Sequence, residues 1–337
     1  MNDPTRESDK ERRLQELRRE ARNHPAVAGE GIVPAGSPLP AAAGEAQGYY
    51  GQPMLKAPVW TWEVPAYFFV GGAAGAAAAI GAVARMAGAD TALVRDARWI
   101  AAAGALASPP LLISDLGRPE RFLNMLRVFK LRSPMSVGAW TLVAFSMAAG
   151  ASAFADLASR RSGGGGPVAP LGNAAEALAA ATGLLLATYT GVLIGATAVP
   201  VWSRNVRLLP MHFGASGLGT AASMLELLGH RDAALNRLAM GAAAVETAIG
   251  LALESRTDPE SNPVRHGRSG GITRAGGVLS GPVPLAMRLL APRSPAARTV
   301  AALSTIAGSL LTRVGWIEAG RESARAPSTS ARHERSS

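Results

Sequence analysis

The stretch WEVPAYFFVGGAAGAAAAIGAVARM, from Trp62 to Met86, decides the fold. Between Glu63 and Arg85 it holds no charged residue, and it exceeds the roughly 20 residues with which a helix crosses about 30 Å of hydrocarbon. Glycine and alanine fill residues 71–79 and give the helix a smooth face, which lets helix backbones approach closely in lipid. We predict a membrane-spanning helix that packs tightly inside a compact bundle.

The composition of the whole chain supports a membrane protein. Of its 337 residues 48% are hydrophobic and 17% are charged, whereas soluble domains carry about 25% charged residues. The charges form short clusters between long apolar stretches, which is typical of membrane spans joined by polar loops. The net charge of +10 lies in the tails and beside the apolar runs, so we expect membrane lipid as a partner and no nucleic acid.

Seven further apolar segments have the length or composition of a span. They are residues 97–116, 137–158, 174–199, 212–228, 233–253, 272–290 and 296–317. The segment 272–290 is the weakest because Arg274, Pro282 and Pro284 interrupt it. We predict an all-α, polytopic integral membrane protein with about eight transmembrane helices.

The polar ends of the chain are predicted to be tails. We expect residues 1–58 to form a largely disordered N-terminal tail, residues 59–320 the transmembrane domain, and residues 321–337 a disordered C-terminal tail. No apolar segment lies near the start, so the first span is expected to act as the insertion signal. The loops after the second and sixth spans are the more basic ones, which favours cytoplasmic termini.

Cysteine and histidine usage limits the metal chemistry of the chain. It contains no cysteine, which excludes iron–sulfur clusters and thiolate zinc sites held by this chain alone. His212 and His230 flank opposite ends of one short span, so they cannot clamp one haem between them. We expect neither haem nor an iron–sulfur cluster here, and any electron-transfer centre would belong to a partner.

The loop after the second span carries a distinctive motif, LLISDLGRPERFLNMLRVFK, from Leu111 to Lys130. Gly117 can end the preceding helix and Pro119 prevents its continuation. The apolar side chains that follow fall on one helical face: Phe122, Met125, Leu126 and Phe129. We predict a short amphipathic helix in the membrane interface. It either anchors the chain on anionic lipid, or it shapes a pocket at headgroup level or docks a partner.

Two carboxylates at the membrane boundary are candidate functional groups, because ionisable residues there are costly unless they are hydrated or paired. Asp115 either serves a site or pairs with Arg118 or Arg121. Glu63 lies among aromatic residues, where it either exchanges a proton with a ligand or is a solvated first-turn glutamate favoured by the helix dipole.

Three residues inside predicted spans also leave alternatives open. Tyr189 either holds a ligand or forms a hydrogen bond between helices. Glu226 and Glu246 are intramembrane carboxylates, which serve either a proton path or structural pairing.

Several motifs together resemble one family. They are YYGQP from Tyr49, WTWEVPAYFFVGGAAG from Trp60, SDLGRPERF from Ser114, SPMSVGAW from Ser133, YTG from Tyr189 and ATAVPVW from Ala196. These stretches resemble the NrfD/polysulfide-reductase membrane-subunit family. The resemblance is strong over residues 49–228, and beyond that only the number and length of the helices agree.

The resemblance implies a fold and a set of partners. It implies eight helices in two four-helix bundles, with a quinone site (menaquinone or ubiquinone) in the first bundle. It also implies an iron–sulfur partner subunit and a molybdopterin catalytic subunit, as in formate dehydrogenase or polysulfide reductase complexes of anaerobic respiration. The chain would sit in a bacterial inner membrane as a multi-pass subunit and would carry only the quinone site of the oxidoreductase.

The resemblance also suggests roles for individual residues. Proton exchange falls to Glu63 and Asp115, quinone binding to Tyr67, Tyr189 and Arg118, and partner docking to Arg121, Arg127 and Arg204. A family member has a histidine near the start of the first span, where this chain has Thr61 and Glu63. Glu63 would then take over the proton-handling role.

A second class of function also fits the residues. A secondary transporter or ion translocator would use the membrane carboxylates and the proline-broken helices. The sequence shows no convincing internal repeat of the kind that many transporters contain.

Overall fold

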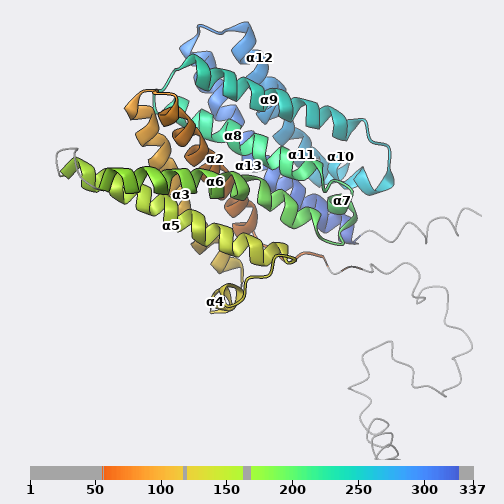
Figure 1. The fold of residues 1–337 in the computed structure, drawn as a ribbon. Coiled ribbons are helices and arrows are strands. Elements are labelled where there is room, and N and C mark those ends of the chain that lie inside the picture. The colour runs from red at the N-terminus through yellow and green to blue at the C-terminus, as the bar shows by residue number, and fades with distance from the viewer. Residues whose placement is uncertain (1–54, 56, 117–119, 162–167, 326–337) are drawn as a thin grey trace, which may run out of the picture. The chain divides into compact units, whose positions relative to one another are not determined.

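The computed structural model describes residues 55, 57–116, 120–161 and 168–325, and all regular elements in these ranges are helices (Figure 1). The predicted all-α class is therefore confirmed. The helices are α2 (Glu63–Met86), α3 (Thr91–Asp115), α4 (Arg121–Leu126), α5 (Pro134–Arg161), α6 (Val168–Gly195), α7 (Pro200–Ser203), α8 (Leu208–Leu227), α9 (Ala233–Glu254), α10 (Asn262–Arg265), α11 (Gly267–Ser280), α12 (Pro282–Leu290) and α13 (Pro295–Arg325). A 3₁₀ turn, Pro259–Ser261, precedes α10.

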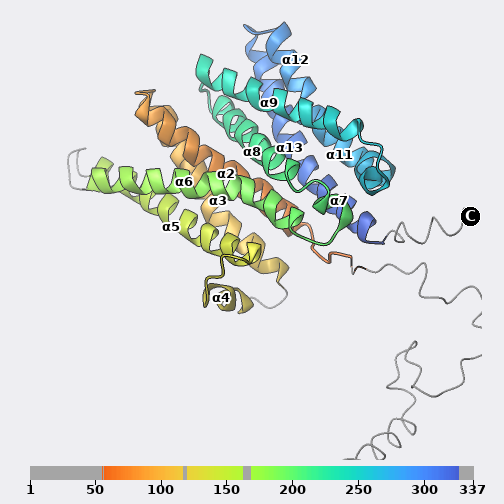
Figure 2. The same cartoon turned by 45° about the vertical axis from the view of Figure 1, so that its right-hand side comes forward.

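The long helices pack in two groups, with α2 between them. In the first group α2 contacts α3 and α6, while α5 contacts α3 and α6. In the second group α13 contacts α8, α11 and α12, while α9 contacts α8, α11 and α12. α2 and α6 also contact α8, so the groups share one core (Figures 1 and 2). Four helices in the described ranges are long and apolar enough to cross a membrane: α2, α5, residues 170–195 of α6, and α13.

The predicted smooth face of the first span is confirmed where α2 crosses its neighbours. A Cβ atom added at Gly75 would lie 2.2 Å from the carbonyl oxygen of Gly183 in α6. A Cβ atom at Gly217 in α8 would lie 2.9 Å from the carbonyl oxygen of Gly72. The backbones of α2, α6 and α8 therefore touch at positions that only glycine allows.

The weak seventh segment is broken into two short helices. α11 ends at Ser280, and α12 begins at Pro282, whose ring nitrogen cannot donate the hydrogen bond that would continue the ladder. At the other end of the chain, α13 continues to Arg325 and buries Ser323. The predicted boundary of the C-terminal tail at residue 320 therefore lies too early, because Ser323 Oγ accepts a hydrogen bond from the backbone N–H of Val201.

Buried ion pairs gather at the end of the molecule where α2 ends and α13 begins. Glu176 of α6 pairs with Arg85 and with Arg98, at 3.2 Å from the latter. Glu226 of α8 pairs with Arg288 at 2.6 Å and with Arg298 at 2.5 Å. For Glu226, structural pairing is therefore the correct interpretation, because each of its oxygens faces a guanidinium group.

Candidate functional site

A cavity lies at the opposite end, where α2 and α5 begin and α3 and α6 end. We call it the tyrosine cavity, and its volume is about 80 Å³. Its walls are Trp60, Val64, Tyr67, Phe68, Leu112, Asp115, Leu116, Met125, Met135, Gly138, Ala139, Tyr189 and Leu193. Because these residues come from α2 to α6, three of the residues assigned by resemblance, Tyr67, Asp115 and Tyr189, meet in one place.

Two tyrosine side chains line the cavity from different helices. Tyr67 is 2% exposed and Tyr189 is 5% exposed. Neither hydroxyl forms a hydrogen bond with another residue in the described ranges, so the alternative in which Tyr189 bonds across helices is not seen. The ring of Tyr189 lies directly over Gly138 of α5, where an added Cβ atom would come within 1.9 Å of its Cζ atom. The absence of a side chain at Gly138 thus leaves the space that this ring occupies.

A single hydroxyl group links the two candidate carboxylates. The backbone N–H of Thr61 donates to Asp115 Oδ1 at 2.9 Å, and the Thr61 hydroxyl lies 3.0 Å from the same oxygen. The Thr61 hydroxyl also contacts Glu63 Oε2. Asp115 lines the cavity and is half-buried, while Thr61 is exposed. The three residues therefore form a short polar path from the cavity wall to the surface.

Aromatic residues tie the cavity to the second group of helices. The ring of Trp60 stacks on Trp202, with a centroid distance of 5.5 Å and an angle of 15° between the planes. Trp202 is buried, and its indole Nε1 donates to the backbone carbonyl of Trp316 at 2.8 Å. Arg321 at the end of α13 donates to the carbonyl of Trp60. Trp60 and Trp202 both lie in motifs of the sequence that were singled out, whereas no sequence signal indicated that Trp316 and Arg321 contact them.

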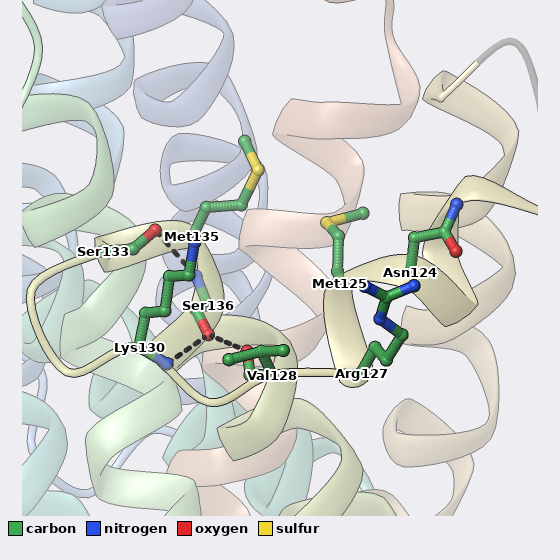
Figure 3. Close-up of a pocket in the computed structure, with 8 residues that line it drawn as sticks. All are labelled: Asn124, Met125, Arg127, Val128, Lys130, Ser133, Met135 and Ser136. Atoms are coloured by element: carbon green, nitrogen blue, oxygen red, sulfur yellow. Dashed lines mark hydrogen bonds between the residues drawn. The ribbon is translucent and has the colours of Figure 1, made fainter.

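A second hollow lies beside the cavity under α4 (Figure 3). Its volume is about 510 Å³, and we call it the α4 pocket. It is lined by Asn124, Met125, Arg127, Val128, Lys130, Ser133, Met135 and Ser136. Met125 and Met135 are flexible side chains that line both hollows. The predicted amphipathic helix therefore shapes a pocket.

The helix α4 is shorter than predicted and ends before Phe129. Ser136 Oγ accepts the backbone N–H of Lys130 at 3.0 Å and donates to the carbonyl of Val128 at 3.3 Å (Figure 3). These bonds tie the chain after α4 to the first turn of α5. They also occupy the N–H of Lys130 and the carbonyl of Val128, which a longer helix would use for its own hydrogen bonds. Phe129 lies against Trp140 of α5, with the ring centroids 6.0 Å apart.

The remaining predicted residues are more scattered. Arg118 lies outside the described residues, and the side chain of Arg121 is likewise outside the description. Arg127 is exposed at the C-terminus of α4 and lines the α4 pocket. Arg204 lies after α7, away from both hollows, with its guanidinium 3.6 Å from Glu260.

The structure contains a second buried polar cluster, which the sequence did not predict. His212 of α8 lies between Glu246 of α9 and Trp316 of α13, at 3.0 and 3.2 Å. The nearby Arg313 is fully buried and donates to the backbone carbonyl of Phe213 at 3.0 Å. His212 and Glu246 were noted separately, but their partners come from helices distant in the sequence. Within the described ranges, no group of three or more metal-ligating side chains is found.

These features define a class: an all-helical membrane protein whose buried polar side chains gather in a few clusters between its helices. The chain belongs to the NrfD-type polysulfide reductase family, whose profile, described as polysulfide reductase, matches residues 46–326. The match covers both groups of helices and so extends beyond the region in which the motifs were clear. The chain is thus a membrane subunit of a redox complex. No curated protein sequence matches it.

Proposed function

We propose that the chain is the quinone-binding membrane subunit of a respiratory oxidoreductase complex, in which electrons pass between quinone at the tyrosine cavity and an iron–sulfur partner docked at the α4 pocket. One observation carries the proposal. Two buried tyrosine side chains and Asp115, which Thr61 links to Glu63, meet at the same cavity. Each tyrosine hydroxyl can donate one hydrogen bond to a ligand in the cavity.

The lining of the cavity fits a quinone ring in its chemistry. The hydroxyls of Tyr67 and Tyr189 can donate to two carbonyl oxygens, and Trp60 and Phe68 offer aromatic faces. The volume of about 80 Å³ is below the roughly 300–1,000 Å³ of typical ligand pockets, so side chains must move to admit a ring. The methionines shared with the α4 pocket are suited to that movement. A bound quinone would supply the two-electron, two-proton chemistry.

Proton exchange falls to the pair of carboxylates. The Thr61 hydroxyl has one hydrogen, so it can donate to Glu63 or to Asp115 but not to both at once. When the Thr61 hydroxyl donates its hydrogen to one carboxylate, its oxygen can accept a hydrogen bond from the other carboxyl group, provided that this second group is protonated. Thr61 therefore lets a proton move between the cavity wall at Asp115 and the half-buried Glu63.

The exposed cations suit partner docking. Arg127 and Lys130 lie at the rim of the α4 pocket, beside the wall of the tyrosine cavity. Such a basic surface favours an acidic face on the partner and steers its approach. Because the chain contains no cysteine, the iron–sulfur centre belongs to that partner, and the molybdopterin chemistry to a further subunit. In this complex the chain crosses a bacterial inner membrane eight times, with cytoplasmic termini.

The test is quinone binding to the full chain in lipid nanodiscs. A soluble naphthoquinone or ubiquinone analogue is titrated, and quenching of tryptophan fluorescence is followed. Tyr189→Phe and Asp115→Asn are each expected to weaken binding about fivefold, the value of one hydrogen bond of about 1 kcal/mol. Asp156→Asn, which changes an ion-paired carboxylate at the far end of α5, is the control and should bind as the wild type does. Wild-type affinity in both cavity variants would reject the proposed site.

A further inference from the structure

A third cavity opens in the second group of helices, between α9, α11 and α12. Its volume is about 220 Å³, and we call it the Glu246 cavity. It is lined by His212, Glu246, Thr247, Gly250, Leu251, Leu253, Glu254, Val264, Thr273, Arg274, Gly277, Val278 and Pro282. Its walls are mostly apolar. This cavity shares no lining residue with the tyrosine cavity.

The cavity has a buried inner end and an exposed rim. Glu246 is 2% exposed, whereas Glu254 and Arg274 are exposed and form an ion pair at 2.8 Å. Glu246 and Glu254 are eight positions apart on α9, which corresponds to about 12 Å along a helix axis. The cavity therefore leads from a charged pair at the surface to a buried carboxylate.

The hydrogen bonds around Glu246 determine the state of His212. Trp316 Nε1 donates to His212 Nδ1 at 3.2 Å, and an indole nitrogen can only donate. His212 Nδ1 thus carries no hydrogen, so the ring is neutral and its hydrogen lies on Nε2. Nε2 is 3.0 Å from Glu246 Oε2 and donates to it. Ser280 Oγ lies 2.8 Å from the same oxygen.

Only one atom of this cluster is open to a further proton. Glu246 Oε2 already receives the hydrogen of His212, and His212 Nδ1 receives that of Trp316. Glu246 Oε1 is buried and has no hydrogen-bond partner among the residues that the structure describes. An additional proton can bind at Oε1 without breaking any of these contacts.

Charged and polar groups from several helices face Glu246. Burial disfavours its carboxylate form, while His212, Arg313 of α13 and the Ser280 hydroxyl stabilise it. Arg313 itself binds Ser309 Oγ at 3.1 Å, Ser216 Oγ and the carbonyl of Phe213, and no guanidinium in the described ranges lies within 4.0 Å of the Glu246 carboxylate. Glu254 and Arg274 at the rim neutralise each other.

Two glycines keep the route to Glu246 open. Gly250 on α9 and Gly277 on α11 both line the cavity. A Cβ atom added at either would meet no atom within 4 Å. A larger side chain at Gly250 would therefore enter the cavity between the rim and Glu246, and the backbone of α9 would not have to move.

We propose that Glu246 and His212 form a protonation site that exchanges protons with the membrane surface through the Glu246 cavity. The proton binds at Glu246 Oε1, His212 holds the other oxygen, and the apolar walls limit the exchange to this route. The site is separate from the tyrosine cavity, so it stands or falls independently of quinone binding.

The experiment is labelling of the full chain in nanodiscs with dicyclohexylcarbodiimide, followed by peptide mass spectrometry over a range of pH. The reagent adds to a protonated carboxyl group: the acid proton moves to a carbodiimide nitrogen, the carboxyl oxygen bonds to the central carbon, and the adduct rearranges to a stable acylurea. We expect an adduct on Glu246 whose yield falls as the pH rises. Glu226 is the control within the same chain, because it is 4% exposed and its two oxygens contact guanidinium groups. Its yield should be lower by about tenfold or more, equivalent to about 1.4 kcal/mol.

A matched pair of variants tests the route. Gly250→Leu should reduce labelling of Glu246 severalfold, while Gly241→Leu should leave it unchanged, because Gly241 lies on α9 with open space around it but outside the cavity. If Gly250→Leu does not fold, Gly277→Leu fills the cavity from the opposite wall and replaces it in the experiment. A membrane peptide with one central glutamate verifies the reagent. An unlabelled Glu246, equal labelling of Glu226, or unchanged labelling in the folded variant with the filled cavity would each overturn the proposal.

Discussion

Buried and half-buried carboxylates at the two ends of the molecule have different partners. Where α2 ends, Glu176 and Glu226 each face two arginines. Toward the other end, Asp115 contacts Thr61, and Glu246 contacts His212 and Ser280. A guanidinium stays charged at any working pH and holds its carboxylate ionised, whereas a hydroxyl or an imidazole tolerates both protonation states. The difference separates carboxylates that hold helices together from those able to exchange protons.

The largest effect is expected for Glu226→Gln. Removing one partner of a buried ion pair costs about 3–5 kcal/mol, because Arg288 and Arg298 would keep buried charges without a counter-ion. The isosteric change Glu246→Gln should cost clearly less, since no described guanidinium contacts that carboxylate. Thermal unfolding in a mild detergent measures both, and equal destabilisation would erase the distinction between the two carboxylates.

A catalytic effect is expected for Thr61→Val, which keeps the shape but removes the hydroxyl between Glu63 and Asp115. Loss of a positioned proton-transfer group typically slows a reaction by about 10²-fold or more. Quinone-linked turnover of the assembled complex should fall accordingly. Thr188→Val is the matched control, because that hydroxyl bonds only to carbonyls of its own helix. Unchanged turnover in Thr61→Val would place proton exchange elsewhere.

A smaller change is expected for Gly138→Ala. The added methyl group would occupy the position of the Tyr189 ring and move its hydroxyl, so quinone affinity should fall by about fivefold, the value of one hydrogen bond. Gly150→Ala in the same helix meets open space and should bind as the wild type does. If both variants retain full affinity in the nanodisc titration, Tyr189 does not hold the ligand.

The smallest effect is expected for Trp316→Phe. Without the indole hydrogen, His212 Nδ1 becomes free to take a proton, and an imidazolium would hold Glu246 ionised. Carbodiimide labelling of Glu246 should then fall by a few-fold, about the effect of one weak hydrogen bond. In the control variant Trp99→Phe, which changes an exposed position of α3, Glu246 should be labelled to the same extent as in the wild type. Increased labelling in Trp316→Phe would show that the tryptophan does not set the tautomer.

The local pattern of the sequence predicted the long helices well, because apolar length and proline breaks act within one segment. The break before Pro282 and the contact of Gly75 with another helix both follow from residue type. The early end of α4 could not be predicted from residue type, since it depends on hydrogen bonds between Ser136 in the first turn of α5 and the backbone of Val128 and Lys130. The continuation of α13 past residue 320 was missed because Ser323 is polar yet bonds to Val201.

The residues of the candidate sites can also be divided into those that local sequence identified and those that only tertiary contacts revealed. By itself the sequence identified Glu63, Asp115, Glu226 and Glu246 as ionisable residues in apolar surroundings, because that depends only on their neighbours along the chain, but it did not single out the buried Glu176. Only the tertiary structure decided which of them meet arginine and which meet threonine or histidine. Those partners lie up to 72 positions away, as Arg298 does from Glu226. The energy of an ion pair depends on distance in space, and the packing of the helices sets that distance.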